Sequence, residues 1–130
     1  MPRPGDGHVG FNEPGSSLRS RTRIKTLTAA TRADNARFFA DLDAVPRHVM
    51  TQGLATIGDA RHLVLIACGA AKAAPIAAAV EGPLTTSCPA SILQWHSHVT
   101  VVIDEDAASL LAHAAYYRET HAGKPSWQHY

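Results

Sequence analysis

Two almost continuous apolar runs mark the second half of the chain, LVLIAC at residues 63–68 and VTVVI at residues 99–103. Runs of this kind are typical of strands that are buried on both faces of a parallel sheet. An alanine-rich stretch over residues 71–80, which ends before a Gly-Pro pair, predicts a helix after the first run. Residues 89–96 (PASILQWH) predict a short helix before the second run.

The first half of the chain is less regular. Residues 1–17 are rich in Gly, Pro and Ser and predict a loop, while β-branched residues alternate over residues 22–28 and predict a short strand. A capping box formed by Thr31 and Asp34 predicts the start of a helix that ends at Pro46. The apolar face of that helix would carry Phe38, Phe39 and Leu42.

Two further helices complete the predicted elements. One covers residues 54–60, and the other follows residues 104–106 as a single helix. Its apolar stripe would consist of Leu110, Leu111, Ala114 and Ala115. Strands that alternate with helices in this way indicate an α/β fold with an open parallel sheet.

The predicted sheet is thin. Two central strands and one peripheral strand are fewer than the roughly five or six strands that such sheets commonly have. We therefore expect a single partial α/β domain over residues 1–130, of the Rossmann-like, three-layer open-sheet type, that lacks its amino-terminal strands. Exposed edges and apolar faces would make the isolated chain poorly soluble or partly molten.

Composition excludes several classes of protein. Hydrophobic residues make up 45% and charged residues 18% of the chain, with a net charge of +1, which is a globular composition without a basis for binding nucleic acid or a membrane surface. No apolar run approaches the roughly 20 residues of a membrane span, and the amino terminus lacks a secretory signal. Cys68 and Cys88 imply no disulfide framework, and Cys68 is expected in the core. We expect a soluble, cytoplasmic protein.

Candidate chemistry begins in the glycine-rich loop, which holds Asp6, His8 and Glu13 within eight residues. A carboxylate beside an imidazole can fix its tautomer and raise its basicity, which suits general acid–base catalysis. By spacing alone, three ordinary surface residues are the commoner alternative. The glycine spacing over residues 5–10 does not indicate a dinucleotide site, because no strand precedes it and no helix follows it.

Two other motifs are weaker. The turn GAAK at residues 69–72 follows the first apolar run and opens a helix, so that its backbone N–H groups and Lys72 could bind an anion. An ordinary turn with an exposed lysine is the alternative. His96 and His98 form an H-x-H pair, but no second pair or acidic cluster completes a metal site. We expect solvent-facing histidines there and no bound metal.

Taken in order, these motifs closely resemble those of the glucosamine-6-phosphate deaminases. The string DGHVGFNEP at residues 6–14 resembles the active-site loop of that family, and the similarity continues along nearly the whole chain. Other matching motifs are SRTRIKTLT at 20–28, NARFF at 35–39, GAAKA at 69–73, AVEGP at 79–83, PASILQWH at 89–96 and KPSWQ at 124–128.

The resemblance implies an enzyme that converts glucosamine 6-phosphate and water to fructose 6-phosphate and ammonia, without a metal or an organic cofactor. It implies that His8 is the acid–base group that opens the sugar ring and that Asp6 and Glu13 orient and tune it. Arg37 and Lys72 match the positions that bind the substrate phosphate.

The resemblance also extends to regulation and assembly. Some members of the family bind N-acetylglucosamine 6-phosphate at an allosteric site between subunits, and many are oligomers. The matching residues of that site are Ser16, Arg23, Lys25 and Thr26. Residues 1–28 would form the active-site loop and a lid-like segment, and residues 29–130 the helices and the two buried strands.

The resemblance covers only the carboxy-terminal half of the family. Its first half carries the carboxylate that abstracts the C2 proton, a Ser/Gly phosphate loop and most central strands. We therefore expect a truncated chain with weak or no deaminase activity of its own. A non-catalytic phosphosugar-binding fragment or subunit is one alternative. A 6-phosphogluconolactonase-like enzyme is another alternative. The FNEP string and the Arg37-Phe38-Phe39 string argue against it, because they resemble the deaminases more closely.

Overall fold

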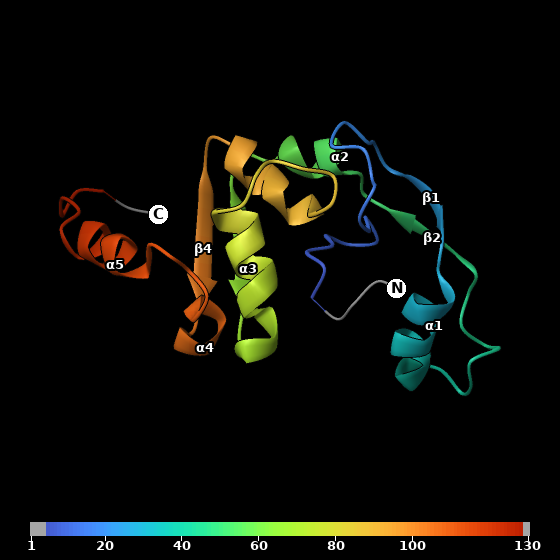
Figure 1. Ribbon diagram of the computed structural model, residues 1–130. Coiled ribbons are helices and arrows are strands. Elements are labelled where there is room, and N and C mark those ends of the chain that lie inside the picture. The colour runs from blue at the N-terminus through green and yellow to red at the C-terminus, as the bar shows by residue number, and fades with distance from the viewer. Residues whose placement is uncertain (1–4, 129–130) are drawn as a thin grey trace.

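The computed structural model describes residues 5–128, which form two small sheets with helices around them (Figure 1). Strands β1 (Arg23–Thr26) and β2 (His48–Thr51) pair antiparallel, and β3 (Leu63–Ala67) and β4 (Val99–Ile103) pair parallel. The parallel pair and the helices around it confirm the α/β class. Figure 1 shows α1 beside the antiparallel pair at one end of the molecule and α5 at the other.

The segment between β3 and β4 follows the predicted order. A 3-10 turn (Ala70–Lys72) leads into α3 (Ala73–Val80), and a 3-10 helix (Pro89–Trp95) precedes β4. Three residues of α3, at a spacing that places them on one face, are buried: Ala73, Ile76 and Ala79. Small side chains at two of these three positions allow neighbouring segments to pack closely against this helix.

Only one face of the β3–β4 sheet is covered. Alternate residues of β3 are half-buried, whereas Val64 and Ile66 are 58% and 70% exposed, and Val102 of β4 is 51% exposed. The prediction that both strands are buried on both faces is therefore wrong for the described chain, because no element lies on the second face. Cys68 is also exposed rather than in the core, because it follows the exposed Val64 and Ile66 at the same two-residue spacing.

The α1 region differs from its prediction. The Thr28 hydroxyl accepts the backbone N–H of Thr31 at 3.1 Å and caps α1 (Ala29–Asn35), so the helix begins before the predicted capping box. The helix also ends early, in a short 3-10 segment (Ala36–Phe38), instead of continuing to Pro46. The residues predicted to form its apolar face are largely exposed: Phe38, Phe39 and Leu42.

Two other parts of the chain also differ from the elements predicted from the sequence. The strand β2 was not predicted, whereas α2 (Leu54–Gly58) was. The single helix predicted after residue 104 is two helices, α4 (Glu105–Ala108) and α5 (Ala114–Ala122). Among the helices of residues 5–128, none has the length and apolarity to cross a bilayer.

Glu81 holds the start of α5 against the end of α3. Its carboxylate accepts the backbone N–H groups of Ala112 at 2.7 Å and His113 at 2.9 Å. Desolvation alone would raise the pKa of Glu81, but these two hydrogen bonds, a third from Tyr117 and the charge of His113 together lower it below its ordinary value of 4.5. Because the ionised form makes these contacts, the attachment of α5 depends on the charge of Glu81.

Candidate active site

Asp6 and His8 are directly paired in the amino-terminal loop. Asp6 Oδ1 lies 2.8 Å from His8 Nδ1 and also accepts the His8 backbone N–H at 3.0 Å. The Asp6 side chain is only 12% exposed, whereas that of His8 is 52% exposed. A sheltered carboxylate that accepts Nδ1–H fixes the tautomer of the ring and leaves Nε2 with its lone pair. Within the described chain Nε2 has no hydrogen-bond partner, so it can face a substrate.

Close packing gives this loop its shape. Gly7 has a φ of +73°, and a Cβ added to it would lie 2.5 Å from Cys88 Sγ. The carbonyl of Gly7 accepts the backbone N–H of Ala90 at 2.8 Å. Burial raises the pKa of the Cys88 thiol, so Cys88 stays protonated and acts here as a small packing residue. Glycine is therefore required between Asp6 and His8.

Asn12 attaches the far side of the loop to the end of β2. It is fully buried, and its Nδ2 donates to the carbonyls of Val9 at 2.9 Å and Gln52 at 2.7 Å. The Thr51 hydroxyl accepts the backbone N–H of Phe11 at 3.2 Å. Sequence reasoning did not single out Asn12, although it lies inside the FNEP string that carried the resemblance. It is a positioning residue for the loop.

Glu13 is not part of a contact triad with His8. Within the described chain its carboxylate accepts a short hydrogen bond from the Thr31 hydroxyl on α1. The structure thus brings together Asp6 and His8 but places the third predicted catalytic group against another element. In this arrangement Glu13 ties the active-site loop to the segment that carries Arg37.

The two predicted phosphate-binding residues lie on separate segments. Lys72 is exposed at the end of the 3-10 turn after β3, and this turn is fixed because the Asp104 carboxylate accepts the Gly69 backbone N–H at 2.9 and 3.0 Å. A Cβ on Gly5 would lie 3.1 Å from the carbonyl oxygen of Ala71, so the loop of His8 starts against the Lys72 turn. Arg37 is exposed after α1, with its guanidinium 4.7 Å from the Phe38 ring centroid.

The residues matched to an allosteric site lie on and near β1. Arg23 and Lys25 are half-buried and share one face of the strand, while the Thr26 hydroxyl lies 3.2 Å from His48 Nδ1. Ser16 is buried, and its hydroxyl has no hydrogen-bond partner among residues 5–128. A role for these four residues in effector binding remains a prediction.

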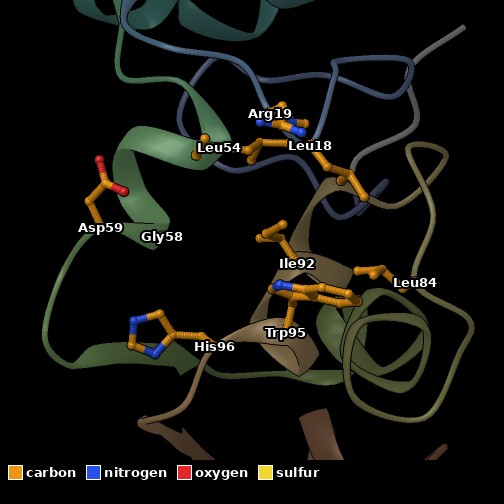
Figure 2. A pocket seen from close by; sticks show the side chains of 10 residues that line it. Leu18, Arg19, Leu54, Gly58, Asp59, Leu84, Ile92, Trp95 and His96 are labelled. Atoms are coloured by element: carbon orange, nitrogen blue, oxygen red, sulfur yellow. The ribbon is translucent and has the colours of Figure 1, made fainter.

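A separate apolar hollow of about 440 Å³ lies between α2 and the 3-10 helix before β4 (Figure 2). Figure 2 shows the Trp95 ring and Ile92 on one side of it and Leu18 and Leu54 on the other. None of the predicted catalytic or phosphate-binding residues lines it.

The histidines near this hollow do not converge on a metal site. His96 Nδ1 accepts the His98 backbone N–H at 3.0 Å, and its Nε2 lies 2.7 Å from the Ala60 carbonyl oxygen. The His98 ring is stacked on His62 with centroids 3.8 Å apart. Residues 5–128 contain no group of three or more His, Cys, Asp or Glu side chains that could hold a metal ion.

Sequence comparison with known proteins gives a consistent result. The chain is 68% identical over 123 residues to the glucosamine-6-phosphate deaminase of Rhodococcus jostii, and 64% identical over 124 residues to that of Streptomyces avermitilis. It is 60% identical over 124 residues to that of Bifidobacterium longum subsp. infantis. Each match covers 95% of this chain but only 46–48% of the relative, so the chain spans about half the length of these curated relatives. No protein-family model matches the chain.

The comparison with solved structures agrees with the sequence comparison. A solved monomeric glucosamine-6-phosphate deaminase of the NagB superfamily matches with a TM-score of 0.74 and 46% identity, over 81% of this chain and 44% of that one. Because that relative is monomeric, the homo-oligomer expected for this chain stays a prediction. By sequence and by fold, the chain matches the carboxy-terminal half of glucosamine-6-phosphate deaminases.

Proposed function

We propose that this chain supplies the acid–base loop and the phosphate-binding side chains of a glucosamine-6-phosphate deaminase. The complete reaction would convert glucosamine 6-phosphate and water to fructose 6-phosphate and ammonia. The observation that carries the proposal is the 2.8 Å contact between Asp6 Oδ1 and His8 Nδ1 inside the DGHVGFNEP loop.

The pair suits the opening of the sugar ring. With Asp6 holding Nδ1–H, Nε2 of the neutral His8 ring can take the proton from the C1 hydroxyl. The resulting imidazolium can return a proton to the ring oxygen as the bond between C1 and that oxygen breaks. In the open aldehyde, a proton must then move from C2 to C1. The resemblance implies that the carboxylate for this step lies in the half of the family that this chain does not match.

Arg37 and Lys72 suit the other end of the substrate. Both are exposed cations, and a guanidinium can bind a phosphate dianion with two parallel hydrogen bonds while an ammonium acts as a point charge. Lys72 is the last residue of the turn that contacts the loop of His8. Arg37 is connected to that loop through the contact of Glu13 with α1. A substrate that binds both residues would therefore lie across the loop.

The test is a fusion protein in which this chain replaces the matched half of the Rhodococcus jostii relative. At 68% identity, the exchanged half should support ammonia release from glucosamine 6-phosphate. His8→Ala should lower kcat by about 10²-fold or more, because it removes a general acid–base group. A matched surface control is His121→Ala on α5. Unchanged turnover in His8→Ala would remove His8 from the mechanism.

The same fusion protein distinguishes deaminase activity from the two alternative functions. A fusion that binds glucosamine 6-phosphate, measured by calorimetry, but releases no ammonia would indicate a phosphosugar-binding module. Turnover of 6-phosphogluconolactone in place of the amino sugar would indicate the lactonase-like alternative.

A further inference from the structure

The segment that carries Arg37 is poorly packed. After the 3-10 turn Ala36–Phe38 the chain forms no helix or strand over residues 39–47, and residues 37–44 are all exposed. Figure 1 shows this segment at the outer edge of the molecule, between α1 and β2. Its own hydrogen bonds are local, such as the one that the Ala44 backbone N–H donates to the Asp41 carboxylate at 2.8 Å. An exposed segment of this kind gains little from apolar burial, so its order depends on polar contacts with its neighbours.

Arg32 of α1 makes such contacts with the end of the segment. Its Nη2 donates to the Leu42 carbonyl at 2.7 Å and to the Val45 carbonyl at 3.1 Å, and its Nε donates to the Val45 carbonyl at 3.2 Å. Arg32 is half-buried and Val45 is buried. In the part of the chain that the structure describes, no carboxylate pairs with Arg32. Because the guanidinium is a planar fork, one side chain holds the end of the segment against the helix that precedes it.

The residue before Arg32 holds a second loop. The Thr31 hydroxyl donates to the Glu13 carboxylate in the loop of His8. Consecutive residues of an α-helix point about 100° apart, so Thr31 and Arg32 can contact different segments from the same turn of α1. This short helix therefore joins the loop of His8 to the segment of Arg37, and Arg32 makes the second of the two connections.

We propose that Arg32 is a positioning residue for Arg37, which keeps residues 36–45 in place so that Arg37 can bind the substrate phosphate. The contacts of Arg32 are with backbone carbonyls, so it acts through the segment rather than on the substrate. Without Arg32 the segment would have to become ordered when the phosphate binds, and that loss of freedom would weaken binding. The proposal rests on the proposed function, because it takes Arg37 as a ligand of the phosphate.

The test uses the fusion protein described above. Arg32→Gln removes the guanidinium fork but keeps a polar side chain. It should raise both KM and the calorimetric Kd for glucosamine 6-phosphate at least about fivefold, with kcat nearly unchanged. In an Arg37→Ala background the same change should have little further effect, because the effects of two residues that act through one contact are not additive. The matched control is Arg118→Gln on α5, where Arg118 pairs with Glu105, and it should leave Kd unchanged.

A second variant decides the question if Arg32→Gln does not fold. Arg32→Lys keeps the positive charge but offers no planar fork, so Kd should rise by a smaller factor of about two to three.

Three results would overturn the proposal. The first is an unchanged Kd in Arg32→Gln, or in Arg32→Lys where the glutamine variant does not fold. The second is a rise of Kd that is equally large in the Arg37→Ala background, and the third is a fusion that binds no glucosamine 6-phosphate. A fusion that binds this sugar but releases no ammonia would reject the proposed function, while calorimetry would still decide the role of Arg32.

Discussion

Replacement of Gly7 by alanine tests whether the acid–base loop is held as tightly as the structure indicates. Gly7 lies between Asp6 and His8 with a φ of +73°, and the added Cβ would meet Cys88 Sγ at 2.5 Å. An ordinary contact between carbon and sulfur needs more than an ångström of additional space. Either the loop or the buried Cys88 must move, and a shift of the loop would move Asp6 and His8.

The cost has two separable parts. Holding a residue other than glycine in the left-handed region costs about 1–2 kcal/mol. Forcing an extra methyl group into a packed site costs a further 1–3 kcal/mol or so. Gly7→Ala should therefore lower the free energy of unfolding by about 3 kcal/mol. With Cys88→Ala the nearest remaining atom of residue 88 is Cβ at 3.7 Å, an ordinary contact, so the second part should disappear in the double variant.

The assay is urea-induced unfolding of the fusion protein, followed by circular dichroism. Gly15→Ala is the matched control, because Gly15 has a φ of +89° but no atom within 4 Å of an added Cβ; it should show the backbone cost alone. The double-mutant cycle of Gly7→Ala with Cys88→Ala should give a coupling energy of about 1–3 kcal/mol. A Gly7→Ala variant no less stable than Gly15→Ala, or a coupling energy near zero, would refute the packing described here.

Three further predictions concern chemistry and pH. Asp6→Asn should lower kcat at least about tenfold, because an amide N–H directed at Nδ1 favours the other tautomer of His8; nitrogen NMR shifts of the His8 ring that match the wild type would contradict this. Arg37→Ala should raise KM for glucosamine 6-phosphate with little change in kcat, and Arg37→Lys should restore part of the affinity; a flat KM would exclude Arg37 from phosphate binding. The pKa of Glu81 is lowered in the folded state, so its contribution to stability is complete above the unfolded pKa and is lost as pH falls through the lower folded pKa. Urea unfolding of Glu81→Gln should accordingly show a weaker loss of stability on acidification, and an unchanged pH profile would refute it.

Elements with a strong local signal could be predicted from the sequence. The run that became β3 is entirely apolar, the run that became β4 is entirely β-branched, and the helix α3 is alanine-rich and ends before Gly82-Pro83. Such signals depend on a few neighbouring residues and need no tertiary contact. The group Asp6, His8 and Glu13 was a candidate from its spacing, but by spacing alone ordinary surface residues were the commoner alternative, and the resemblance supplied the catalytic roles.

Features that depend on distant segments were missed or misassigned. The strand β2 exists because His48–Thr51 pairs with β1 across more than twenty residues. The contact of Glu13 with Thr31 rather than with His8 depends on where α1 lies. The break between α4 and α5 has a similar origin, because Glu81 binds the backbone N–H groups of Ala112 and His113 and draws the chain out of a continuous helix.

The two parts of the site are held in place by different contacts. His8 and Asp6 are positioned by packing of their loop against Cys88, Ala90 and the turn of Lys72, all within this chain. That turn follows β3 and is held by the Asp104 carboxylate, which accepts the Gly69 backbone N–H. The direct contact between Asp6 Oδ1 and His8 Nδ1 fixes the tautomer within the loop itself, so a change in the Lys72 turn should affect KM more than the tautomer of His8.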